Sequence, residues 1–83
     1  MTELLHFTAD WCQPCKKIKP LIDDYISNNP DIKYTRIDIE EDFDTAKYYN
    51  VMSIPTLIVI KDNIVYNRHT GMATPEKIAS LFE

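Results

Sequence analysis

The stretch from Ala9 to Lys17 reads Ala-Asp-Trp-Cys-Gln-Pro-Cys-Lys-Lys, and it holds both cysteines and the only tryptophan of the chain. Cys12 and Cys15 are separated by two residues, so their thiols can close a small disulfide or open to a dithiol. Pro14 suits the first turn of a helix, where its missing N–H costs little. We therefore expect Cys12 at a helix N-terminus, where free backbone N–H groups stabilise a thiolate. This pattern indicates reversible redox chemistry.

A metal site is the main alternative for a cysteine pair of this spacing. A structural zinc ion needs about four ligands. Beyond the two cysteines the chain offers His6 and His69, and neither has a ligand spacing relative to the pair. A metal could then be held only between two copies of the chain, so we expect redox chemistry with no bound metal.

The size and charge of the chain limit its domain count and its partners. It has 83 residues and a formal net charge of -4, so a single domain over residues 1–83 is expected. Proteins bind nucleic acids and anionic membranes through basic patches. Because this chain carries a net negative charge, neither is an expected partner. We find no signal-peptide pattern and no run of ~20 apolar residues. A cytoplasmic protein is expected, and in that reducing setting paired cysteines are catalytic or metal-binding more often than structural.

Apolar periodicity predicts the order strand, helix, strand, helix, strand, strand, helix. The expected strands cover residues 4–8, 33–39, 57–60 and 65–68, and the expected helices cover residues 12–28, 42–49 and from 75 onward. A right-handed crossover should make the first two strands parallel, and the last two should form a hairpin. The prediction is an α/β fold with a four-stranded mixed sheet and helices on both faces.

Four positions are expected to set special backbone geometry. Gly71 is the only glycine, so it should serve either a positive φ or a close approach. Asn50 can take the left-handed conformation that ends the second helix. Asp62-Asn63 should turn the hairpin, although this pair suits positive φ less well than Asn-Gly. Pro20 lies inside the first helix and should kink it.

The residues around the cysteines point to a family. Trp-Cys-Gln-Pro-Cys-Lys at residues 11–16 resembles the Trp-Cys-Gly-Pro-Cys-Lys active site of thioredoxins. Phe7, Pro20, Ile54-Pro55-Thr56 and Gly71 are similar to that family's strand phenylalanine, helix proline, cis-proline loop and substrate-loop glycine. The resemblance runs from about Leu4 to the C-terminus. It implies a minimal thioredoxin fold with strand order 2-1-3-4 and three helices.

The resemblance also implies an activity and a site. Cys12 is the expected nucleophile and Cys15 the expected resolving cysteine, in a protein that reduces protein disulfides. Pro55 is expected in cis, presenting the backbone of Ile54 to an extended substrate. The other expected substrate-binding residues are Trp11, Gln13, Pro14, Gly71, Met72 and Ala73. Family function implies electrons from NADPH through a thioredoxin reductase, targets such as ribonucleotide reductase, and a monomer that takes part in electron transport and cell redox homeostasis.

The chain departs from the thioredoxin pattern at several positions. It starts at the family's second strand, so the strand 33–39 should become a sheet edge. Gln13 replaces a glycine between the cysteines, and Asn63 replaces the hairpin glycine. His6 stands where the family has a buried aspartate, and Arg36 stands where it has the lysine paired with that aspartate. His6 is therefore either the proton acceptor for Cys15 or a core histidine without a chemical role.

Two other functions remain open on the sequence. A glutaredoxin-like electron donor fed by glutathione is the first, although Trp11 and Pro14 differ from the Cys-Pro-Tyr/Phe-Cys pattern usual there. A thioredoxin-fold interaction module without catalysis is the second. Such modules commonly lack one or both cysteines, so the intact pair argues against it.

Overall fold

The computed structural model describes residues 1–83. The strands are β1 (Thr2–Thr8), β2 (Ile32–Asp38), β3 (Thr56–Lys61) and β4 (Ile64–Thr70), and the helices are α1 (Gln13–Ser27), α2 (Phe43–Tyr48) and α3 (Pro75–Ser80). Each predicted element is present in the predicted order. The largest difference is in β4, which begins one residue earlier and ends two residues later than predicted because its pairing with β3 continues to Thr56↔Thr70.

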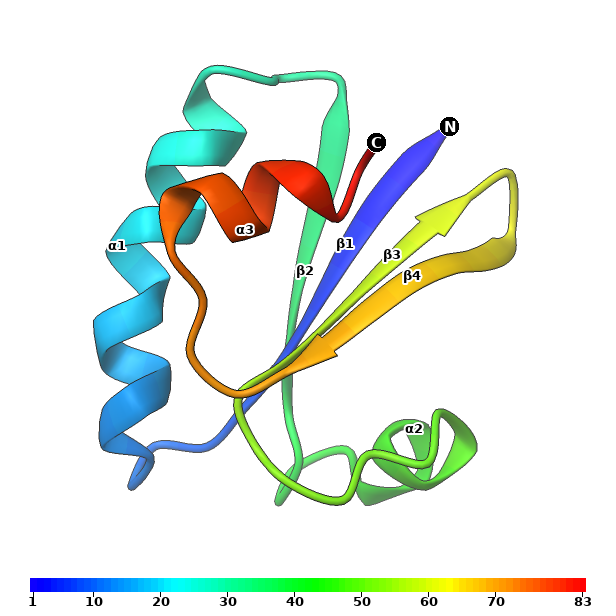
Figure 1. Cartoon of the computed structure of the whole chain (residues 1–83). Helices are drawn as coiled ribbons and strands as arrows, with labels where there is room; N and C mark the ends of the chain where they lie inside the picture. The colour runs from blue at the N-terminus through cyan, green and yellow to red at the C-terminus, as the bar shows by residue number, and fades with distance from the viewer.

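The strands form one mixed sheet in the order β2-β1-β3-β4. β1 is parallel to β2 and antiparallel to β3, and β3 and β4 form the hairpin. This confirms the predicted α/β architecture with strand order 2-1-3-4. β2 pairs with β1 alone and is a sheet edge, as expected. Figure 1 shows α1 and α3 on one face of the sheet, while α2 lies beside the end at which β1 and β2 finish.

The core is divided by the sheet into two apolar clusters, because successive side chains of a strand point to opposite faces. Leu4 of β1 belongs to the cluster that α1 and α3 cover, together with Ile18 and Ile22. Leu5 and Phe7 belong to the cluster beneath α2. The residue between Leu5 and Phe7, His6, consequently faces α1.

Asn50, Gly71 and the Asp62-Asn63 pair have the backbone geometry predicted for them, whereas Pro20 lies within α1 and the kink expected there stays a prediction. Asn50 ends α2 at a φ of 57°, and Gly71 has a φ of 99°. Asp62 and Asn63 both take positive φ in the hairpin turn, which is the geometry of the two-residue turns that match strand twist. Asp62 accepts a 2.7 Å hydrogen bond from the N-terminal ammonium group, and this hydrogen bond, together with the positive charge of the ammonium group, lowers the pKa of the Asp62 carboxyl group.

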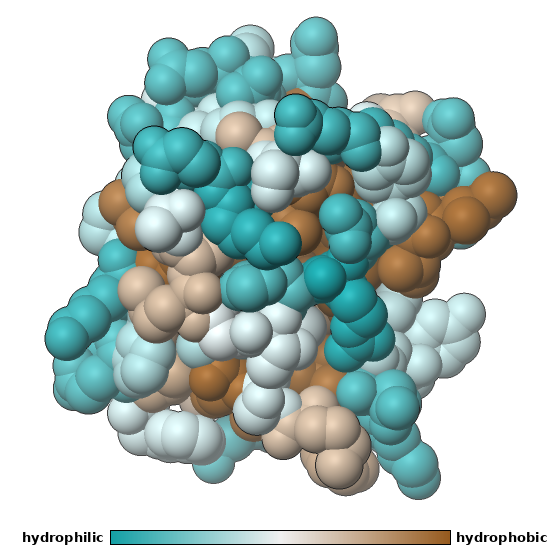
Figure 2. Space-filling model, in the orientation of Figure 1, coloured by the Kyte–Doolittle hydropathy of each residue, from teal (hydrophilic) through white to brown (hydrophobic).

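The surface in the view of Figure 2 is mostly polar, with an apolar patch over the β3–β4 hairpin, where Ile64 and Val65 are exposed. That hairpin tip lies at the opposite end of the sheet from the start of α1 (Figure 1). None of the helices has both the length and the apolar character needed to span a bilayer.

Candidate active site

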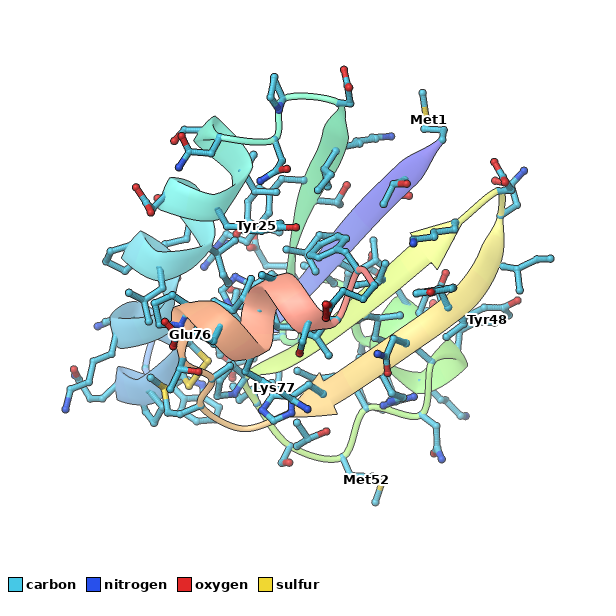
Figure 3. The ribbon with its side chains drawn as sticks, turned by 45° about the horizontal axis from the view of Figure 1, so that its top comes forward. Met1, Tyr25, Tyr48, Met52, Glu76 and Lys77 are labelled. Atoms are coloured by element: carbon cyan, nitrogen blue, oxygen red, sulfur yellow. A yellow bond between two sulfur atoms is a disulfide. The ribbon has the colours of Figure 1, made fainter.

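The two cysteines lie where β1 passes into α1. Cys12 is the N-cap of α1, and its Sγ accepts a 3.2 Å hydrogen bond from the backbone N–H of Cys15. The two sulfur atoms form a disulfide, with 5.3 Å between the Cα atoms, and Figure 3 shows this bond in the first turn of the helix. An orphan N–H of the first turn is thus aimed at the Cys12 sulfur, which is the arrangement that stabilises a thiolate.

Trp11 directly precedes Cys12 in the sequence, and its side chain is tied to the neighbouring loop. Its side chain is 61% exposed, and its Nε1 donates a 3.0 Å hydrogen bond to Oε1 of Glu40. The buried carboxylate of Asp38 holds that loop by accepting hydrogen bonds from the backbone N–H groups of Glu40 and Glu41, at 2.8 and 3.3 Å. The exposed indole is therefore held in place. The sequence did not predict a site role for Glu40, because acidic residues before a helix are usually solvated.

The loop before β3 and the turn after β4 form the opposite wall of the site. The Ile54–Pro55 peptide bond is cis, as expected from the resemblance. The N–H of Gly71 donates a 2.8 Å hydrogen bond to the carbonyl of Pro55. A Cβ on Gly71 would meet nothing within 4 Å, so this position needs glycine for its positive φ and not for space.

The predicted substrate platform divides into exposed and buried members. Gln13, Pro14 and Met72 are exposed around the cysteines. Ala73 is only 8% exposed and packs into the core cluster beneath α1 and α3. Its side chain supports the platform from below and offers almost no surface to a partner.

An apolar groove of about 100 Å³ continues the site toward α2. Its apolar lining residues are Ile39, Phe43, Ala46, Val51, Met52 and Ile54. Ile39 and Ile54 also pack against the cysteines, so the groove and the disulfide share a wall. Met52 projects outward from the loop after α2 (Figure 3).

His6 lies behind the disulfide, on the α1 face of the central strand β1. It is 1% exposed, and its Nδ1 lies 2.9 Å from the hydroxyl oxygen of Tyr34. Its Nε2 is buried and has no hydrogen-bond partner. His6 and Cys15 line the same cavity, which has a volume of about 230 Å³ and opens between Lys16, Lys19 and Arg36. The histidine therefore shares a cavity with the resolving cysteine.

Burial, with help from nearby positive charges, keeps the imidazole of His6 neutral. Burial, followed by the positive charges of Arg36 and Lys19, lowers the pKa of His6 from 6.5 to about 4. Arg36 stands directly beside His6 in the register of the two parallel strands. Its guanidinium lies 3.1 Å from a carboxylate oxygen of Asp10. The expected proximity of His6 and Arg36 is thus observed.

Tyr34 is a neighbour of His6 that the sequence did not identify as part of the site. It precedes Arg36 by two residues on β2, so its side chain points to the same face. Burial raises the pKa of Tyr34 to about 12, with a further contribution from Asp23. The phenol is consequently uncharged at neutral pH.

A metal centre finds no support in the arrangement of side chains. No group of three or more His, Cys, Asp and Glu residues comes together in a way that could hold a metal ion. His69, the second histidine, places its Nε2 2.9 Å from the carbonyl of Met72. It lies on β4 and takes no part in the cavity that Cys15 and His6 share.

Comparisons with known proteins agree with this geometry. The family model described as Thioredoxin matches residues 2–83. The thioredoxin of Bacillus subtilis is 40% identical over 79 residues, which cover 94% of this chain and 76% of that protein. The thioredoxin of Staphylococcus aureus is 37% identical over 84 aligned positions, which cover 98% of this chain and 79% of that protein.

Solved structures show the same relationship. The oxidised form of mitochondrial thioredoxin 3 from Saccharomyces cerevisiae superposes with a TM-score of 0.88 at 30% identity, covering 95% of this chain and 74% of that one. Fasciola hepatica thioredoxin has a TM-score of 0.88 at 28% identity, covering 95% and 75%. The fold and the closely spaced cysteine pair define a thiol–disulfide oxidoreductase. More particularly, the chain belongs to the thioredoxin family.

Proposed function

We propose that this protein reduces disulfides in other proteins by cycling between the Cys12–Cys15 disulfide and the dithiol. The observation that carries the proposal is the position of Cys12 at the N-cap of α1, with its sulfur accepting the N–H of Cys15. A thiolate there has a pKa of ~7 in related sites, against ~8.5 for a free cysteine. Cys12 is thus the thiol that attacks at neutral pH.

The reaction proceeds through two exchanges. The Cys12 thiolate attacks one sulfur of the substrate disulfide, that S–S bond breaks, and its electron pair leaves on the second substrate sulfur. Cys15, as a thiolate, then attacks the Cys12 sulfur and displaces the remaining substrate thiolate. The substrate gains two electrons and, with protons from the medium, becomes a dithiol. The protein is left with the Cys12–Cys15 disulfide.

His6 is the proposed proton acceptor for Cys15 in the second exchange. The two residues line one cavity, and Nε2 has no other partner. The pKa of about 4 applies to the disulfide form, in which Cys15 carries no charge. A thiolate developing at Cys15 is an opposite charge, and it raises the affinity of the imidazole for the proton.

The substrate would bind as an extended segment along the Ile54 backbone, between Trp11 and the turn at Gly71. The exposed Met72, Gln13 and Pro14 would complete this surface, as the family resemblance implies. Thioredoxins generally act with a thioredoxin reductase and disulfide-containing substrates. NADPH through such a reductase is accordingly the proposed electron source, and the protein would work as a monomer in the cytoplasm.

A coupled assay tests the function and its electron source together. Insulin is the disulfide substrate, and NADPH oxidation is followed with either a thioredoxin reductase or glutathione plus glutathione reductase. We expect turnover with the thioredoxin reductase and little with glutathione. Efficient turnover with glutathione alone would instead support the glutaredoxin-like alternative, and no reduction even with excess dithiothreitol would leave only an interaction module.

The proton acceptor is tested by the rate of the second exchange against pH in His6→Ala. We expect a lower rate and a changed pH profile relative to the unmodified protein. His69→Ala is the matched control, because that histidine lies outside the cavity, and its profile should be unchanged. A His6→Ala profile identical to that of the control would show that His6 is a core residue without a chemical role.

A further inference from the structure

The contact between Tyr34 and His6 has a chemical consequence that rests on the function proposed above. Nδ1 of His6 lies 2.9 Å from the Tyr34 hydroxyl. A hydrogen bond at this distance can form in two ways, because a neutral imidazole carries its hydrogen on one nitrogen or on the other. Either Nδ1–H donates to the phenol oxygen, or the phenol O–H donates to a bare Nδ1.

The two arrangements differ at the other ring nitrogen. If the phenol donates, Nε2 carries the hydrogen and becomes a buried donor without a partner. Leaving a buried donor without a hydrogen bond is destabilising, because the desolvation of that donor is not compensated. If Nδ1–H donates, only a lone pair is left on Nε2, and unpaired buried acceptors are tolerated better than unpaired buried N–H groups.

The surroundings favour the same arrangement. Tyr34 lies on the edge strand β2 and is half-buried, so its own hydroxyl hydrogen can be directed to solvent when its oxygen accepts. The charged side chains that line the cavity are three positive ones and one carboxylate, Asp10, so their net charge is positive; the positive ones are Lys16, Lys19 and Arg36. Positive charge favours a lone pair over an N–H group directed toward it.

We propose that Tyr34 is a positioning residue that fixes His6 in the Nδ1–H tautomer, so that the free lone pair of Nε2 accepts the proton from Cys15. In the second exchange, the Cys15 S–H proton moves to Nε2. The new Cys15–Cys12 bond forms as the bond from Cys12 to the substrate breaks, and its electron pair leaves on the substrate sulfur. Throughout, Nδ1–H keeps its hydrogen bond to the phenol oxygen.

Tyr34 is not itself the base in this scheme. Its phenol is neutral throughout the working pH range, because the pKa of Tyr34 is about 12. A neutral phenol oxygen accepts a hydrogen bond from Nδ1–H but does not remove that proton at neutral pH. The proton that His6 receives therefore stays on the imidazole until it returns to solvent through the cavity.

The tautomer of His6 is measured directly by ¹⁵N nuclear magnetic resonance of the imidazole nitrogens in the oxidised protein at neutral pH. We expect a protonated, pyrrole-like Nδ1 and a bare, pyridine-like Nε2. In Tyr34→Phe, Nδ1–H loses its acceptor, so the Nε2–H tautomer should gain population. Tyr25→Phe is the control, since Tyr25 also has a partly buried ring on the α1 side but stacks on Phe82 away from His6.

Kinetics of the isolated second exchange supply a readout of function. We expect Tyr34→Phe to slow it by about three- to tenfold, the effect of one net hydrogen bond, and Tyr25→Phe to leave it unchanged. A protonated Nε2 in the unmodified protein, or an unchanged tautomer and rate in Tyr34→Phe, would overturn the inference. These outcomes are separate from failure of the proposed function, because the tautomer is measured without turnover and insulin reduction is measured on the unmodified protein.

Discussion

The buried neutral state of His6 makes the stability of the folded protein sensitive to acid in a defined pH window. The pKa of His6 is lowered from 6.5 to about 4 by burial and by the charges of Arg36 and Lys19. Between these two pH values the unfolded chain binds a proton at His6 and the folded protein does not. Protonation therefore favours unfolding, and the free energy of unfolding should fall as the pH falls from 6.5 to 4.

The size of the effect follows from the two pKa values. One pKa unit corresponds to about 1.4 kcal/mol, so the shift from 6.5 to about 4 amounts to about 3 kcal/mol. The contribution of neutral His6 to the free energy of unfolding is fully retained above pH 6.5. The whole of this contribution has been lost once the pH is below 4. A domain of this size is stable by roughly 5–10 kcal/mol, so the loss is a large fraction of its stability.

Urea denaturation of the oxidised protein at pH values from 7.5 to 4 measures this loss, and variants separate His6 from the carboxylates that also titrate in acid. His6→Leu and His6→Gln lack the titrating group, so their free energies of unfolding should fall by about 3 kcal/mol less than that of the unmodified protein. His69→Gln is the control and should keep the unmodified pH dependence. Parallel curves for the unmodified protein and both His6 variants would refute the assignment of a buried, neutral His6.

Three further predictions concern the surroundings of His6 and the fold. Arg36→Gln removes a positive charge beside His6 and so raises the pKa of His6 in the folded protein. The acid-induced loss of stability should therefore become smaller and be complete at a higher pH than in the unmodified protein, as measured by the same denaturation series. Phe7→Ala should lower the free energy of unfolding by about 3–5 kcal/mol because Phe7 is fully buried. Ile64→Ala, at an exposed site, should change the free energy of unfolding by no more than about 0.5 kcal/mol. Urea denaturation midpoints measure both values. Thr74→Ala removes the N-cap hydroxyl that accepts a 3.1 Å hydrogen bond from the backbone N–H of Lys77 at the start of α3. Thermal unfolding should show that the free energy of unfolding falls by about 1 kcal/mol.

The local patterns of the sequence were sufficient to predict the fold and to identify the reacting sulfur atoms. Side chains alternate between the two faces along β1, so His6 lies on the opposite face from Leu5 and Phe7. The helix signal after Cys12 puts this cysteine at an N-cap. These features depend on residues close in the chain, so periodicity and capping chemistry predict them. The cis geometry at Pro55 was expected only from the resemblance to thioredoxins.

The contacts between distant segments were not predictable in the same way. The hydrogen bond between His6 and Tyr34 depends on the register of β2 against β1, and the bond from Trp11 to Glu40 depends on where two loops meet. Neither register nor loop position is encoded in the pattern of one segment. The resemblance to thioredoxins predicts Ala73 on the substrate surface, yet Ala73 packs beneath α1 and α3.

Mass spectrometry of Cys15→Ser tests directly whether Cys12 attacks a protein disulfide and Cys15 releases the product. The reduced variant is mixed with disulfide-bonded insulin. We expect a covalent complex linked through Cys12 in Cys15→Ser, no such complex in Cys12→Ser, and rapid turnover in the unmodified protein. A complex linked through Cys15 in Cys12→Ser, or equal insulin reduction by the unmodified protein and Cys12→Ser, would contradict this assignment of the two cysteines.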